Sequence, residues 1–116
     1  MKAPGGMRSA ILNVTIKELG ELYECYMPFV THGGLFIATN RQFLLEDEVF
    51  VVLELLNEAE KFPLTGKVVW ITPPGVVVNR KQGIGIQFSS ENADLVAKIE
   101  THLAGMLNSD NPTYTL

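Results

Sequence analysis

The sequence has few of the residues on which most catalytic and metal sites depend. Its 116 residues include one cysteine, Cys25, and two histidines, His32 and His102. A single cysteine excludes a disulfide bond within the chain. Hydrolytic and metal sites need several His, Cys, Asp or Glu side chains that converge, and the spacing of the histidines gives neither of them such partners. We therefore expect no enzymatic activity, no metal site and no cofactor.

Positive charge and long apolar runs are also scarce. The chain has 9 Lys and Arg against 13 Asp and Glu, which gives a net charge of -4. A mildly acidic chain is a poor match for nucleic acid or an anionic membrane surface. No run reaches the ~18 apolar residues that a membrane helix needs, and the first residues lack the apolar segment of a signal peptide. We expect a cytoplasmic protein that does not insert into a membrane.

Most of the chain has the apolar pattern of β-strands. Strands are expected at 10–17, 21–29, 34–39, 48–56, 61–72 and 83–88. From Leu95 onward apolar residues recur every three or four positions, which predicts a helix over about 91–107. Six strands and one helix favour a six-stranded antiparallel β-barrel with a C-terminal α-helix. One domain is expected at 10–108, between a flexible N-terminus at 1–9 and a flexible tail at 109–116.

The stretch FVTHGGLFIAT, residues 29–39, joins a polar turn to the start of a strand. Its glycines, Gly33 and Gly34, allow a positive φ or a close approach of the backbone to another group. Two later stretches, TGKVVWI at 65–71 and GIGIQF at 83–88, follow in order. Together these stretches closely resemble the PilZ domain family, and within it the stand-alone members that serve type IV pilus assembly. The resemblance implies the PilZ-type β-barrel with its C-terminal helix.

The resemblance also implies that the nucleotide site of the family has degenerated here. PilZ domains are typically receptors for cyclic di-GMP, with Arg-x-x-x-Arg before the first strand and [Asp/Asn]-x-Ser-x-x-Gly leading into a strand. Gly34 matches the glycine and Thr31 replaces the serine, but Phe29 stands where Asp or Asn belongs. The arginine pair is absent, because Leu12 follows Arg8 by four residues. Such arginines form hydrogen bonds and ion pairs with the phosphates. Because they are absent, we expect no direct binding of cyclic di-GMP.

By resemblance, such a chain is a non-enzymatic adaptor in type IV pilus biogenesis and twitching motility. The implied partners are the pilus extension ATPase and a regulator with a degenerate EAL domain, through which the cyclic di-GMP signal would arrive. The implied location is the cytoplasm, with recruitment to the inner-membrane base of the pilus machine. The alternative is a cyclic di-GMP receptor with atypical binding residues, Arg8, Lys17 and Thr31, against which the absent arginine pair counts.

An adaptor needs exposed contact residues, and aromatic side chains are frequent anchors of protein interfaces. Trp70 precedes the Pro73-Pro74 strand break and Tyr23 lies in the expected 21–29 strand; core and interface are equally expected for both. The candidate interface residues are Tyr23, Tyr26, Met27, Phe29, Trp70 and Tyr114.

Four large apolar residues are assigned to the core: Phe36, Phe50, Leu64 and Val68. Leu64 and Val68 share one face of the expected 61–72 strand. Phe29 has two possible places: it fills the degenerate nucleotide site, or it is exposed.

Overall fold

The computed structural model describes residues 7–73 and 81–104. Its elements are β1 (Met7–Ile16), α1 (Leu19–Cys25), β2 (Gly34–Ala38), β3 (Glu48–Leu55), β4 (Phe62–Thr72), β5 (Gly83–Gln87), η1 (Ser90–Asn92) and α2 (Ala93–His102). The predicted flexible tail at 109–116, and residues 1–6 of the predicted flexible N-terminus, lie outside the described residues. The first strand begins at Met7, three positions earlier than expected.

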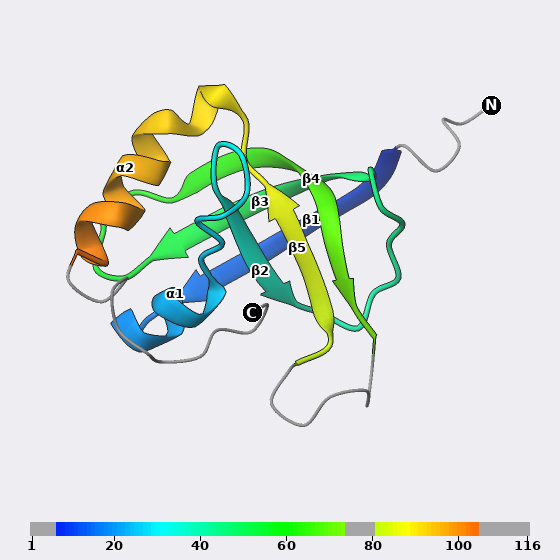
Figure 1. The fold of residues 1–116 in the computed structure, drawn as a ribbon, viewed down its shortest axis with the longest axis horizontal. Helices are drawn as coiled ribbons and strands as arrows, with labels where there is room; N and C mark the ends of the chain where they lie inside the picture. Colours follow the sequence, from blue (N-terminus) through cyan, green and yellow to red (C-terminus); the bar gives the residue numbers. More distant parts are fainter. Residues whose placement is uncertain (1–6, 74–80, 105–116) are drawn as a thin grey trace.

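The strands form one curved sheet in the order β1–β3–β4–β5–β2 (Figure 1). The pairs β3–β4, β4–β5 and β2–β5 are antiparallel. In contrast, β1 runs parallel to β3, which is possible because the long segment 17–47 connects them. The edges β1 and β2 are not paired with each other, so the described sheet is a half barrel of five strands. The strand-dominated fold with a C-terminal helix is confirmed, whereas the closed six-stranded antiparallel barrel is not.

The segment that was predicted to be the second strand is the helix α1. Leu22, Tyr23, Cys25 and Tyr26 are all buried, and this i, i+1, i+3, i+4 spacing matches one face of a helix. The chain becomes extended only at Tyr26, which forms an isolated antiparallel bridge with Leu35. The strand prediction for 21–29 is therefore wrong, and Tyr23, which was expected in that strand, lies in the helix.

The core lies between the concave face of the sheet and the two α-helices. Along β3, buried and more exposed side chains alternate, and Val49, Val51 and Leu53 are buried on the core face of the sheet. α2 adds Leu95 and Ile99, which are one helical turn apart. The predicted core residues Phe36, Leu64 and Val68 are buried as expected. Phe50 is 40% exposed, because its place in the β3 alternation puts it on the outer face.

The end of α2 is tied to the hairpin between β3 and β4. His102 Nε2 lies 3.0 Å from Glu58 Oε2 in a hydrogen bond, and Lys98 Nζ lies 3.4 Å from Glu58 Oε1. The hydrogen bond with His102 and, to a lesser degree, the charge of Lys98 hold the pKa of Glu58 below its usual value. These contacts fix one end of the helix, and the opposite end adjoins the glycine turn.

Candidate functional site

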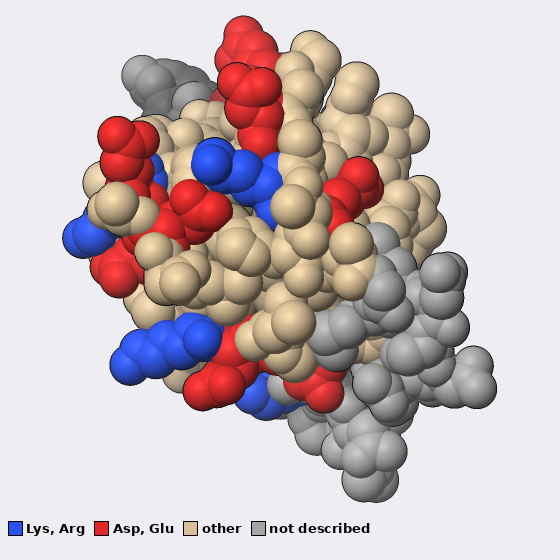
Figure 2. All heavy atoms as spheres, turned by 90° about the vertical axis from the view of Figure 1, so that its left-hand side faces the viewer, with Lys and Arg blue, Asp and Glu red and all other residues tan. Residues whose placement is uncertain are grey.

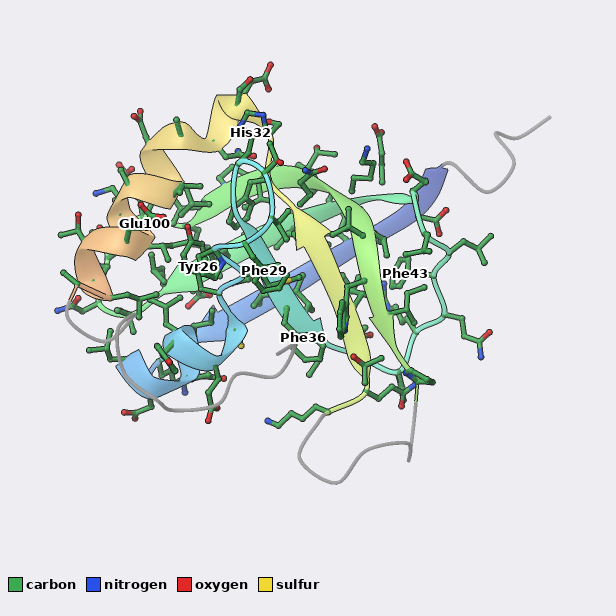
Figure 3. All side chains as sticks on the ribbon, viewed as in Figure 1. Tyr26, Phe29, His32, Phe36, Phe43 and Glu100 are labelled. Carbon is green, nitrogen blue, oxygen red and sulfur yellow. The ribbon has the colours of Figure 1, made fainter. Side chains whose placement is uncertain are left out.

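The glycine turn at 28–33 lies between β2 and the start of α2 (Figure 3). The Gly33 N–H donates to the Val30 carbonyl at 2.7 Å, and the Phe88 N–H donates to the Gly33 carbonyl at 2.9 Å. His32 and Gly33 have φ angles of 68° and 82°, which lie in the left-handed region. Histidine tolerates this region better than most residues but still prefers others, so the surrounding hydrogen bonds hold the turn in this shape.

Close packing explains the glycine that matches the nucleotide motif. A Cβ atom on Gly34 would lie 2.6 Å from the Ile86 carbonyl oxygen, well inside van der Waals contact. Gly34 pairs with Gln87, so the contact is made by the backbone of the neighbouring strand β5. The Gln87 side chain also donates to the Thr31 carbonyl at 3.1 Å. The close packing of β2 on β5 therefore requires a glycine at this position, whether or not a ligand binds.

Tyr26 joins the glycine turn to α2. Its hydroxyl donates a 2.6 Å hydrogen bond to Glu100 Oε2, and the rest of its side chain is buried. A Cβ on Gly33 would lie 3.2 Å from the same hydroxyl, so the turn packs directly on it. Burial, followed by the hydrogen bond and charge of Glu100, raises the pKa of Tyr26 well above its usual value. The phenol therefore stays protonated and acts as a donor that positions the turn.

We expect Tyr26→Phe to lower the free energy of unfolding by about 1–2 kcal/mol, because the Glu100 carboxylate loses a hydrogen-bond donor. Urea denaturation followed by circular dichroism measures the change. Glu100→Gln is the matched variant: its amide oxygen still accepts from Tyr26, so the loss is smaller. Unchanged stability in Tyr26→Phe would mean that the bond does not hold the turn.

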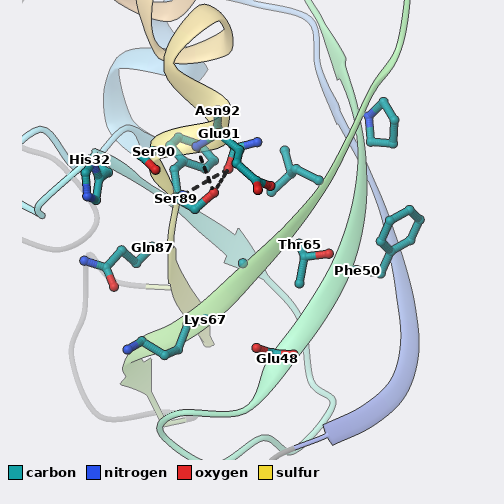
Figure 4. A pocket seen from close by; sticks show the side chains of 14 residues that line it. His32, Glu48, Phe50, Thr65, Lys67, Gln87, Ser89, Ser90, Glu91 and Asn92 are labelled. Carbon is teal, nitrogen blue, oxygen red and sulfur yellow. Dashed lines mark hydrogen bonds between the residues drawn. The ribbon is translucent and has the colours of Figure 1, made fainter.

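An open groove of about 1000 Å³ lies beside the turn, over the outer face of β3 and β4 (Figure 4). We call it the outer-sheet groove; its lining residues include His32, Glu48, Phe50, Pro63, Thr65, Lys67, Gln87 and Ser89 to Asn92. Its floor contains a row of three paired residues, Glu48, Lys67 and Gln87, on adjacent strands. The wall opposite is the start of the η1–α2 segment.

The sequence also matches the family model of the PilZ domain, over residues 9–105. The chain belongs to the PilZ domain family. PilZ domains are generally non-enzymatic binding or adaptor domains, so membership indicates a receptor or adaptor role related to cyclic di-GMP. No curated protein matches the sequence.

The charges in the outer-sheet groove of this PilZ domain are mainly negative among the described residues. The only lysine in the groove lining, Lys67, lies 3.5 Å from the carboxylate of Glu46. Glu48 and Glu91 add two carboxylates to the same lining. A phosphate placed in this groove would therefore meet like charges, and among its described lining residues Lys67 is the one basic side chain.

The atypical receptor residues are not brought together either. Arg8 lies near the start of β1, and Lys17 directly follows its end at Ile16. A strand advances about 3.3 Å per residue, so their backbones are about 30 Å apart. Thr31 is exposed on the glycine turn. The PilZ domain thus offers no common site for Arg8 and Lys17.

The structure divides the candidate interface residues of this PilZ domain. Tyr23, Tyr26 and Met27 are at most 6% exposed, because the helix α1 and the bridge that follows it turn them inward. They are core residues and present no side chain to a partner. Phe29 is 52% exposed, and Trp70 is half-buried. Tyr114 lies outside the described residues.

Trp70 packs beside a glycine of the neighbouring strand β5. It pairs with Gly85, and Gly85 pairs with Phe36 on the next strand, so Trp70 and Phe36 project to the same face. A Cβ on Gly85 would lie 2.9 Å from both Met27 Sδ and Trp70 Cβ. Met27 thus covers the glycine beside Trp70, and Phe29 follows Met27 by two residues. Phe29 and Trp70 are the two described candidate residues that keep exposed area, and we use the name aromatic patch for these two residues together.

The face that carries α2 has mixed charge. Figure 2 views the molecule from the side that carries α2, where acidic and basic side chains are intermixed without a continuous basic area. Among the described residues, no three His, Cys, Asp or Glu are placed to hold a metal ion. Neither described α-helix has the length and apolar character needed to cross a membrane.

Proposed function

We propose that this PilZ domain is a protein-binding adaptor that does not itself bind cyclic di-GMP. One observation carries the proposal: Phe29 stands where the family motif has a polar base-reading residue, and its ring is 52% exposed. A phenyl ring accepts no hydrogen bond from a guanine edge, but an exposed aromatic ring is a frequent anchor in protein interfaces. The acidic groove beside the turn supports the same conclusion.

The proposal extends to the process that the domain serves. Its resemblance to stand-alone PilZ domains suggests type IV pilus biogenesis and twitching motility, in the cytoplasm at the inner-membrane base of the pilus machine. The proposed partners are the pilus extension ATPase and a regulator with a degenerate EAL domain. The regulator would carry the nucleotide signal, and the aromatic patch would contact one of these two proteins.

We expect no heat in a calorimetric titration of the protein with cyclic di-GMP up to high-micromolar ligand. The physical reason is that two phosphates would meet Glu48 and Glu91 without an arginine pair to neutralise them. A PilZ domain that carries both nucleotide motifs, titrated with the same ligand stock, is the positive control. Binding at micromolar ligand or below would overturn the proposal and favour the receptor with atypical residues.

A further inference from the structure

The outer-sheet groove ends at the exposed side chain of Phe50, and a second exposed apolar side chain lies beside it on the neighbouring strand. Phe50 of β3 is 40% exposed and pairs with Ile11 of β1, which is 54% exposed. Pro63 of β4 is also exposed nearby, two positions from Thr65, the residue paired with Phe50. This part of the sheet therefore offers contiguous apolar area on the face opposite the core.

The rest of the groove is acidic. Glu48 lies two residues from Phe50 on the same face of β3, and Glu91 projects from the opposite wall, as Figure 4 shows. Neither carboxylate has an ion-pair partner among the described residues within 4.0 Å. Lys67, the one lysine among the described lining residues, lies 3.5 Å from the carboxylate of Glu46. A ligand in this groove thus meets an excess of negative charge.

The acidic wall is held rigidly. Ser89 Oγ accepts a hydrogen bond from the Glu91 N–H at 3.2 Å, and the Ser89 N–H donates to Asn92 Oδ1 at 3.0 Å. This reciprocal capping box fixes the backbone that carries the Glu91 side chain. Two of the first N–H groups of the segment are also occupied by it, so they are not available to a bound anion. The occupied N–H groups and the carboxylate of Glu91 both disfavour an anionic ligand.

We propose that the outer-sheet groove binds a segment of a partner protein in which Lys or Arg lies next to an apolar side chain. The apolar residue would cover Phe50 and Ile11, and the cations would pair with Glu48 and Glu91. A cation above the exposed Phe50 ring would gain further attraction. A second copy of this chain is a weaker fit, because the chain is acidic overall, with a net charge of -4. The proposal concerns a different surface from the aromatic patch and does not depend on the pilus assignment.

The test uses a fluorescein-labelled peptide, Arg-Leu-Lys-Phe-Arg-Leu, with Glu-Leu-Glu-Phe-Glu-Leu as its acidic counterpart. We expect the basic peptide alone to bind, with an affinity that falls as salt rises. In the double variant Glu48→Gln with Glu91→Gln, the affinity should fall about tenfold, since two exposed ion pairs are lost. Phe50→Ala should weaken binding as well, and its exposure leaves the fold intact.

The matched control is Glu18→Gln with Glu60→Gln, which removes the same charge from exposed positions outside the groove. It should bind the basic peptide as the unmodified protein does, at each salt concentration. Amide chemical shifts of the isotope-labelled protein should change at Glu48, Thr65 and Glu91. Equal losses in both double variants, or shifts confined to other residues, would overturn the proposal. Self-association measured by sedimentation, abolished by Glu48→Gln with Glu91→Gln, would instead identify a second copy as the occupant and also overturn it.

Discussion

Gly34→Ala is expected to lower the free energy of unfolding by about 2–3 kcal/mol. The added methyl group would lie 2.6 Å from the Ile86 carbonyl oxygen, a backbone atom that is fixed by the pairing of β2 with β5. A flexible side chain could move aside, but a strand in the middle of a ladder cannot move without loss of hydrogen bonds. The strain therefore separates β2 from β5 at the point where the glycine turn ends and β2 begins.

The matched control for this substitution is Gly20→Ala in α1. A Cβ on Gly20 meets nothing within 4 Å, and alanine is the better helix former by about 0.5–1 kcal/mol. Gly20→Ala should therefore raise the midpoint of urea unfolding, whereas Gly34→Ala should lower it. If Gly34→Ala changed the stability by less than about 0.5 kcal/mol, as a surface substitution does, close packing of β2 on β5 would not explain the glycine.

The stability change in Gly34→Ala tests whether the glycine of the family motif is required for packing or for ligand binding. In a nucleotide receptor, the motif glycine lets the backbone approach the ligand closely. Here Gly34 already approaches a neighbouring strand, so the motif can lose its polar residues and still require its glycine. A glycine at this position is therefore weak evidence for nucleotide binding. Phe29, which replaces the polar residue of the motif, is stronger evidence against it.

The sequence was sufficient to predict the longer elements of the fold. β3 and β4 alternate between buried and exposed positions over much of their lengths, and α2 has a regular helical period, so each pattern repeats often enough to be distinctive. α1 spans only seven residues, and its apolar residues fit either period about equally well. No local sequence pattern predicts the parallel pairing of β1 with β3, because this pairing depends on the path of the long segment 17–47 that connects the two strands.

Only those parts of the candidate site whose residues lie close together in the sequence could be predicted. The glycine turn and the exposed Phe29 could be found from one short stretch of the chain. The hydrogen bond from Tyr26 to Glu100 joins residues 74 positions apart, so no sequence pattern contains it. The outer-sheet groove likewise arises from strand register, which places Phe50 beside Ile11 and Glu48 beside Lys67. Phe50 was expected in the core, whereas the alternation of β3 places it on the outer face.

Phe29→Ala and Trp70→Ala should each weaken capture of the partner that contacts the aromatic patch by about 2 kcal/mol, or roughly 30-fold. Phe29 is mostly exposed, so its removal should leave the unfolding midpoint unchanged. Trp70 is half-buried beside Met27, so a modest loss of stability is expected as well. Capture of the purified extension ATPase and of the EAL-domain regulator, each measured by surface plasmon resonance, gives both affinities.

Tyr23→Ala tests whether Tyr23 is an interface residue or a core residue. Tyr23 is 6% exposed, so truncation should destabilise the protein by about 3 kcal/mol and impair capture only in proportion to the unfolded fraction. Leu44→Ala is the matched surface control, because Leu44 is 56% exposed and lies outside the patch. Normal capture by folded Phe29→Ala and Trp70→Ala proteins would show that the aromatic patch is not the contact surface. A folded Tyr23→Ala protein that lost capture would mean that α1 opens when the partner binds.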